Sequence, residues 1–374
     1  MGPDRGQAAI LGMGLAQPSP EASLLPLPGE VGLGPVSAHL CPAVLGKGII
    51  PAAVLRKLGR AQKLALMAAH EALQTYPLPS SDQEQAALCL GTGFGELGET
   101  LLFLTNLIRR REQEPMPTRF TNAVHNSLAS QVAILFSLKG ENHTFTQGPV
   151  SFELALWQAL RLLAAGRARR VLVLGVDDLQ PFLAYAGVRF GFWQVAETPD
   201  SRASADFEEP LPGEGAAAFV LVGESECPEP AVHPLLKSVR MQPVTFGQDQ
   251  TPDRQGELAF LLRFLNDNGL APGDLDLVLP GAASWNQFHA WYLPVLEDLS
   301  RSRGRPLGAA LYKQQCGEFC TASALGLALA VGLLKGGDWP PGMPLWGELP
   351  ARPKHILLYQ TSPLGFQSAC LVGI

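Results

Sequence analysis

The chain has 374 residues, of which 47% are hydrophobic and 17% charged, and its formal net charge is −6. This length allows one large duplicated domain or two ordinary domains around a sizeable core. The negative charge argues against a nucleic-acid partner and against an anionic membrane surface. The six cysteines are scattered without a CxxC pair, so we expect no zinc site, no disulfide framework and no bound metal or cofactor.

Strands and helices alternate along the N-terminal half. Helical periodicity predicts helices at 60–76, 96–110, 127–136 and 153–165, and apolar runs predict strands at 8–11, 86–90, 170–175 and 216–222. The Pro- and Gly-rich segment 17–51 is predicted to be loop, and 179–209 a covering loop with short helices. The N-terminus has no long apolar run. We therefore expect a cytoplasmic protein without a signal peptide or membrane span.

The same alternation returns after residues 227–234, which hold three prolines and are predicted to be a linker. Strands are predicted at 236–240, 275–279, 356–359 and 369–372, with helices at 254–268, 291–301 and 323–334. Strands that alternate with helices indicate an α/β fold with buried sheets. We predict an internal duplication with halves at 1–227 and 235–374.

Residues 140–151 are typical of a strand, a tight Gly-Pro turn and a helix that begins at about Phe152. At such an elbow an acyl-transfer enzyme presents Cys or Ser, because the helix N-terminus favours developing negative charge. Here the turn holds Gln147, Gly148 and Pro149, none of which can form a thioester. The sequence therefore predicts a reaction centre without a nucleophile.

Several motifs in chain order resemble those of the β-ketoacyl synthase family, which has the thiolase fold, a duplicated α-β-α-β-α layered fold. The resemblance covers nearly the whole length. The sequence around His125-Asn126 resembles a divergent subfamily of bacterial polyene and aromatic polyketide clusters. The motifs are Gly12-Met13-Gly14, Gly91-Thr92-Gly93-Phe94-Gly95, Lys139-Gly140-Glu141-Asn142, Leu211-Pro212-Gly213-Glu214-Gly215, Lys313 to Glu318 and Leu364-Gly365-Phe366.

The resemblance implies a catalytic Cys that takes an acyl chain from a carrier protein and two His that promote malonyl decarboxylation. Ungapped spacing places the Cys position on Pro149, and a two-residue gap would place it on Gln147. The first His position falls on about Ala282 and the second on Glu318, while the preceding Lys persists as Lys313. All three catalytic groups are therefore expected to be absent.

This pattern resembles the chain-length factor, an inactive subunit that often carries Gln at the Cys position. The resemblance implies a heterodimer with an active ketosynthase, and an acyl carrier protein whose phosphopantetheine holds the acyl chain. It implies that Phe94, Leu97 and Leu101 lie on one helical face and limit the acyl tunnel, with an aromatic gate near Leu364 or Phe366. It also places His125 and Asn126 near the dimer interface.

Plainer readings and two other functions stay open. Leu97 and Leu101 could be ordinary core residues, and Glu318 could merely fill the space of an imidazole. Arg109-Arg110-Arg111 could complement a helix dipole or dock an acidic carrier. One alternative function is a rewired acyltransferase, decarboxylase or hydrolase that uses Glu318 with Ser151, Cys316 or His289. The other is a protein that binds carrier or synthase without setting product length.

Overall fold

The computed structural model describes residues 6–19, 21–28, 34–43, 46–113, 116–195, 209–247 and 250–374. Its centre is an 11-stranded sheet in the order β11-β10-β9-β12-β13-β8-β1-β7-β6-β4-β5. The N-terminal strands are β1 (Ala8–Ala16), β4 (Ala87–Gly91), β5 (Asn142–Phe145), β6 (Arg170–Asp177) and β7 (Gly215–Gly223). The C-terminal strands are β8 (Leu235–Pro243), β9 (Leu277–Pro280), β10 (Gly308–Ala310), β11 (Leu345–Trp346), β12 (His355–Ser362) and β13 (Phe366–Gly373).

The two sets of strands repeat one pairing pattern. Strand β1 pairs antiparallel with β7, β7 antiparallel with β6, β6 parallel with β4, and β4 parallel with β5. In the same way β8, β13, β12, β9 and β10 follow one another with two antiparallel and then two parallel pairings. The sets join where Ala8 and Ala9 of β1 pair with Leu236 and Leu235 of β8.

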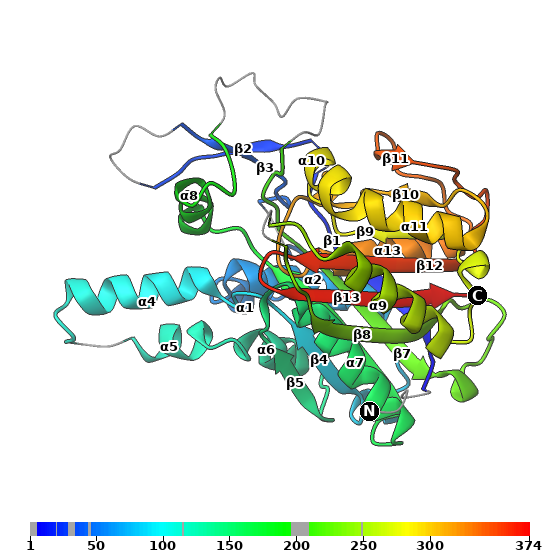
Figure 1. Cartoon of the computed structure of the whole chain (residues 1–374). Helices are drawn as coiled ribbons and strands as arrows, with labels where there is room; N and C mark the ends of the chain where they lie inside the picture. Colours follow the sequence, from blue (N-terminus) through cyan, green and yellow to red (C-terminus); the bar gives the residue numbers. More distant parts are fainter. Residues whose placement is uncertain are drawn as a thin grey trace.

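Helices α7 (Ser151–Ala164) and α13 (Ser323–Leu334) form a central layer that contacts strands of both sets. Their apolar side chains share one core with alternate residues of strands from both sets, including Phe219 of β7 and Leu358 of β12. Helix α13 has buried apolar residues on every side, as expected of a helix covered by sheets on both faces. The C-terminal strands β12, β13 and β8 cross the middle of the molecule in Figure 1.

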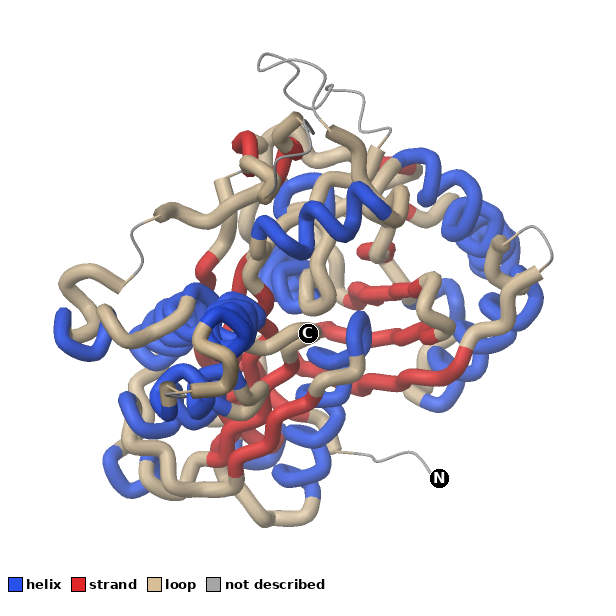
Figure 2. The backbone as a smooth tube through the Cα atoms, turned by 90° about the vertical axis from the view of Figure 1, so that its left-hand side faces the viewer, coloured by secondary structure: helices blue, strands red, loops and turns tan. Residues whose placement is uncertain are grey.

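Two outer helical layers complete the fold. Helices α2 (Arg60–Thr75) and α6 (Ser127–Leu135) pack on the outer face of the N-terminal strands. Helices α9 (Arg254–Asp267) and α11 (Leu293–Arg303) cover the C-terminal strands. Helices flank the strands throughout the tube view (Figure 2). The order of layers is α-β-α-β-α, so the predicted fold class is confirmed.

The structure contains several elements that the sequence analysis did not predict. Segment 17–51 includes the hairpin β2 (Ser23–Leu25) and β3 (Val36–Ala38), and strands β10 and β11 lie at the far sheet edge. Part of the predicted covering loop, 196–208, lies outside the described residues. The remaining short helices are α1 (Ala52–Leu55), α3 (Ser80–Gln83), α5 (Pro117–Ala123), α8 (Pro181–Arg189), α10 (Trp285–Gln287), α12 (Lys313–Cys316), the π-helix Phe288–Tyr292, and 3-10 turns at Gly148–Val150, Glu224–Glu226 and Pro272–Asp274.

Helix α4 (Leu97–Arg109) projects away from these layers beside α5, at the left of Figure 1. None of its residues is buried, although its sequence is largely apolar. Within the part of the chain that the structure describes, no helix has both the length and the apolar character needed to cross a bilayer.

Candidate functional site

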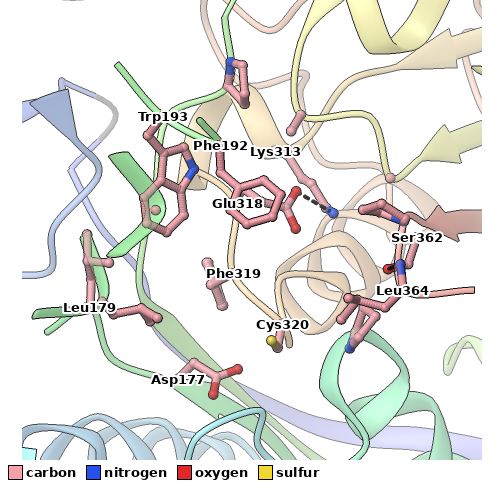
Figure 3. Close-up of a pocket in the computed structure, with 18 of the residues that line it drawn as sticks. Asp177, Leu179, Phe192, Trp193, Lys313, Glu318, Phe319, Cys320, Ser362 and Leu364 are labelled. Atoms are coloured by element: carbon pink, nitrogen blue, oxygen red, sulfur yellow. Dashed lines mark hydrogen bonds and ion pairs between the residues drawn. The ribbon is translucent and has the colours of Figure 1, made fainter. Parts of the chain in front are cut away.

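A cavity of about 500 Å³ lies where the elbow, the loop after β4 and the loop after β12 converge. Most of its wall is apolar and aromatic. Figure 3 shows Phe192 and Trp193 on one side of the cavity and Ser362 and Leu364 on the other. The apolar and aromatic lining residues include Phe94, Leu179, Leu183, Phe190, Phe192, Trp193, Phe319 and Leu364, and the polar ones include Lys313, Glu318, Asp178, Gln287 and Gln360.

The elbow has the predicted strand-turn-helix form. Strand β5 ends at Phe145, a 3-10 turn spans Gly148–Val150, and α7 begins at Ser151. Gly148 has a φ of +52°, which a residue with a side chain rarely adopts. A Cβ built there would face Leu364 Cδ1 at 3.5 Å. Pro149 is buried and lines the cavity, whereas Gln147 is exposed.

The Ser151 hydroxyl is fully used inside the elbow. Its Oγ accepts a hydrogen bond from the Gln147 amide at 2.8 Å and donates one to the Gly148 carbonyl at 2.7 Å. The residue is completely buried and is not among those that line the cavity. Ser151 therefore closes the turn, and this geometry opposes its use as a nucleophile.

The position expected for the second His holds an ion pair. Lys313 Nζ lies 2.7 Å from Glu318 Oε2, and both residues line the cavity (Figure 3). The Lys313 side chain is buried, and an ammonium that is out of water needs such a partner. Glu318 therefore neutralises the charge that Lys313 brings into the apolar wall.

The position expected for the first His is apolar and turned into the core. Ala282 is completely buried among residues of the C-terminal core, while its neighbours Gly281 and Ala283 line the cavity. Polar groups follow Ala282 in the chain: Ser284, whose Oγ accepts from the Gln287 backbone amide, and Gln287, whose Oε1 accepts from the Ala283 amide at 2.7 Å.

The other candidates for a rewired site lie away from the cavity. His289 is exposed on the π-helix, stacked on Trp285 with ring centroids 5.5 Å apart. Cys316 is buried, and burial raises the pKa of its thiol to about 12. A thiol with that pKa is almost entirely protonated at neutral pH and is a poor nucleophile.

The loop that carries Phe94 is held by Asp177 at the end of β6. Asp177 Oδ1 accepts from the Gly93 amide at 2.7 Å and from Thr92 Oγ1 at 3.0 Å. Its Oδ2 accepts from the amide and hydroxyl of Thr321. Phe94 lies in the turn before α4, not on the helix itself, so it does not continue the helical face of Leu97 and Leu101.

Buried carboxyl groups lie near the N-terminus of α4. Glu96 precedes the first residue of α4, and its Oε1 accepts a hydrogen bond from the Gln62 amide. Glu214 forms an ion pair with Arg60. Burial raises the pKa of Glu96 to about 8 and that of Asp178 to about 7, with the negative charges of neighbouring carboxylates as a further cause.

The predicted interface residues lie outside the cavity. His125 and Asn126 are exposed just before α6, and His125 packs against Gly95. Asn126 stands at the N-cap of α6, but its side chain makes no capping hydrogen bond. Leu97 and Leu101 on α4 are half-buried and do not line the cavity.

Sequence reasoning did not identify Phe190, Phe192 and Trp193 as wall residues. They follow α8 in a segment without periodicity, and Trp193 packs against Gly187 of that helix. A cluster of three aromatic residues in a polar loop is the signal that could have indicated a ligand-facing segment. Among the described residues there is no cluster of three or more His, Cys, Asp or Glu side chains suited to a metal ion.

Part of the chain matches a known family model and a curated protein. Residues 49–226 match the family model described as Beta-ketoacyl synthase, N-terminal domain. Fumosorinone synthetase of Cordyceps fumosorosea (strain ARSEF 2679) is 30% identical over 174 residues, which cover 43% of this chain. The chain spans only 4% of the length of that relative.

Solved structures of similar fold span the whole chain. The ishigamide ketosynthase/chain length factor matches with a TM-score of 0.77 and 20% identity over 99% of each chain. A beta-ketoacyl synthase from Burkholderia phymatum STM815 has a TM-score of 0.77 and 14% identity over 98% of this chain and 99% of its own. A chain of AntDE:AntF, a type II PKS acyl-carrier protein in complex with its ketosynthase bound to the hexaketide, gives 0.72 and 15% over 99% of each. These matches establish the ketosynthase fold.

Proposed function

We propose that this chain is a non-catalytic subunit that pairs with an active ketosynthase and shapes its acyl tunnel. Its ketosynthase fold, and the match of residues 49–226 to a β-ketoacyl synthase N-terminal domain, support the proposal. The observation that carries the proposal is the elbow. Gln147, Gly148 and Pro149 occupy the turn, and the hydroxyl of Ser151, at the start of α7, makes its hydrogen bonds to the turn itself. No side chain there can hold an acyl group as a thioester.

The groups around the elbow support the same proposal. Decarboxylative condensation needs donors that stabilise an enolate and an oxyanion. Glu318, paired with Lys313, offers acceptors near the second His position, and Ala282 offers no polar group at the first. The alternative of a rewired enzyme loses support. The Ser151 hydroxyl is hydrogen-bonded within the turn, Cys316 is buried, and His289 does not line the cavity.

The proposed partner surface is formed by α4 and α5. The side chains of Leu102, Leu104, Ile108 and Phe120 are exposed on these two helices, and Ile108 is 75% exposed. Exposed large apolar side chains gathered on projecting helices are typical of a protein interface. The ishigamide structure is a ketosynthase/chain length factor. We propose the corresponding heterodimer here, with an acyl carrier protein that delivers the phosphopantetheine-bound chain.

Co-expression with a Cys-His-His ketosynthase from the same gene neighbourhood tests this proposal. We expect the two chains to co-purify, the complex to condense malonyl units, and this chain alone to leave malonyl-loaded carrier protein unchanged. Decarboxylation of malonyl carrier by the isolated chain would contradict the proposal and restore the rewired-enzyme alternative.

The tunnel role is tested at Phe94, which is 41% exposed in the turn that leads into α4. In the complex we expect Phe94→Ala to lengthen the products and Phe94→Trp to shorten them, because a packed wall yields little to added volume. Phe182→Ala is the matched control, since this exposed phenylalanine on α8 does not line the cavity. The same product length in all three variants would favour an interaction protein without a length-setting role.

A further inference from the structure

We propose that Lys237 is a site of covalent acylation, at which an acyl thioester transfers its acyl group to the side-chain amine with His355 as the base. The two residues lie at the end of the sheet opposite the cavity, where β12 begins. From His355 to Ser362, which lines the cavity, β12 spans roughly 23 Å at about 3.3 Å per residue. The proposal concerns this chain alone and does not depend on its pairing with a ketosynthase.

The sheet holds the amine and the imidazole together. Strands β12, β13 and β8 are neighbours, and Gly373 of β13 pairs with His355 on one side and with Leu235 of β8 on the other. A Cβ at Gly373 would come within 2.8 Å of His355 Cδ2 and 2.9 Å of Lys237 Cε. Because Gly373 has no side chain, the two side chains meet over it, and Lys237 Nζ lies 3.0 Å from His355 Nε2.

The second ring nitrogen of His355 decides which tautomer faces Lys237. His355 Nδ1 lies 3.1 Å from the carbonyl oxygen of Asp274, which can only accept a hydrogen bond, so Nδ1 carries the proton. Nε2 is then the unprotonated nitrogen, and it accepts a hydrogen bond from Lys237. The Asp276 carboxylate accepts from the His355 backbone amide at 3.1 Å and fixes the start of β12. A base is therefore directed at the amine.

The surroundings of Lys237 favour the free amine over the ammonium ion. Among the described residues Lys237 forms no ion pair, whereas Lys313 is paired with Glu318. The Lys237 side chain is half-buried, and burial lowers the pKa of its ammonium group, although the negative charge of Glu224 acts in the opposite direction. At a given pH, more of the nucleophilic amine is present than in a fully exposed lysine.

The proposed step is an acyl transfer from sulfur to nitrogen. The Lys237 amine attacks the carbonyl carbon of the thioester, so that an N–C bond forms and the C–S bond breaks. His355 Nε2 takes the proton that the nitrogen loses and passes it to the departing thiolate. The products are an uncharged amide at Lys237 and one thiol for each acyl group transferred.

Peptide mapping measures the selectivity of this reaction. The full chain is incubated at pH 8 with S-acetyl-N-acetylcysteamine, a small neutral thioester, and mass spectrometry follows acetylation at each of the eight lysines. Lys335 is the internal control: partial burial lowers the pKa of its ammonium group too, but this group has no hydrogen-bond partner among the described residues. We expect acetylation of Lys237 to be at least about tenfold faster than that of Lys335. Equal rates at these two lysines would overturn the proposal.

Two variants test the part that His355 plays. His355→Gln keeps a hydrogen-bond acceptor but cannot take up a proton, so we expect the Lys237 rate to fall at least about tenfold and the Lys335 rate to stay the same. His289→Gln, at an exposed histidine on the π-helix, is the matched control and should leave both rates unchanged. A Lys237 rate that His355→Gln does not lower would contradict the proposed base. A thermal melt of each variant confirms that it is folded.

Discussion

Asp177 and Thr321, which are 144 residues apart in the chain, share two hydrogen bonds: Asp177 Oδ2 accepts from the Thr321 amide at 3.0 Å and from its hydroxyl at 2.8 Å. Asp177 ends a strand of the N-terminal half, and Thr321 follows the Lys313–Glu318 pair in the C-terminal half. Both residues are buried. The contact therefore fixes the Phe94 turn, which the other Asp177 oxygen holds, relative to the opposite wall of the cavity.

Thr321→Val should weaken this clamp without changing side-chain volume. A hydrogen bond to a charged acceptor contributes about 1.5–3 kcal/mol, so we expect the free energy of unfolding to fall by that amount. Urea denaturation followed by circular dichroism measures the change. The exposed Thr105→Val on α4 is the control and should lie within about 0.5 kcal/mol of wild type. A neutral Thr321→Val would show that the clamp does not stabilise the fold.

Ser151→Ala should destabilise the elbow and leave function intact. The change leaves the Gln147 amide and Gly148 carbonyl without the hydroxyl that joins them, at a cost of about 1–3 kcal/mol. We expect the folded complex with a ketosynthase to keep its turnover, with the acyl label on the ketosynthase chain alone. An acyl label on this chain that Ser151→Ala removes and Ser130→Ala keeps would instead identify Ser151 as a nucleophile.

Glu153 should make stability depend on pH. It is buried on α7, and burial raises its pKa from 4.5 to about 7. Between these values the folded state holds a proton that the unfolded state has lost, so stability is full below about pH 4.5 and falls as pH rises toward 7. Glu153→Gln should remove this loss of unfolding free energy at high pH, which amounts to at most about 3 kcal/mol at pH 8. Parallel slopes of unfolding free energy against pH for the two proteins would refute the assignment.

Ile108→Asp should break the proposed heterodimer and spare the monomer. The side chain is 75% exposed on α4, so the isolated chain should lose less than about 0.5 kcal/mol of stability. A charge in the apolar centre of an interface should lower the yield of co-purified ketosynthase at least tenfold. Leu345→Asp, at an exposed leucine on β11, is the control. Undiminished co-purification would remove α4 from the interface.

The sequence predicted the parts of the fold with strong periodicity. Helix α13 has the predicted bounds, and α7 begins within two residues of its predicted start. Strand β10 was missed because its three residues, Gly-Ala-Ala, carry no β-branched or aromatic side chain and pair only through long-range contacts. The division into halves at 227–235 stays a prediction, as do the assigned roles of Pro149, Gln147 and Glu318.

The site was harder to predict than the fold because its walls come from distant segments. The absence of Cys and Ser from the turn Gln147-Gly148-Pro149 could be read from the sequence, because the residues of the elbow are consecutive. Lys313 and Glu318 are five residues apart in the chain, so their ion pair is also a local contact. Phe192 and Trp193 form a visible aromatic cluster in the sequence, but their position opposite Leu364 could not be predicted, because only tertiary structure brings α8 and its following loop there.

The helical layer shared by α7 and α13 makes each half a poor candidate for separate production. A fragment that ends at the linker would leave one flank of α7 bare, and a fragment that begins there would lack α7 beneath β8. Each fragment would expose a large hydrophobic surface to water, and such surfaces cause aggregation. The polypeptide should therefore melt in a single cooperative step, and a chain shortened for expression should keep the linker intact.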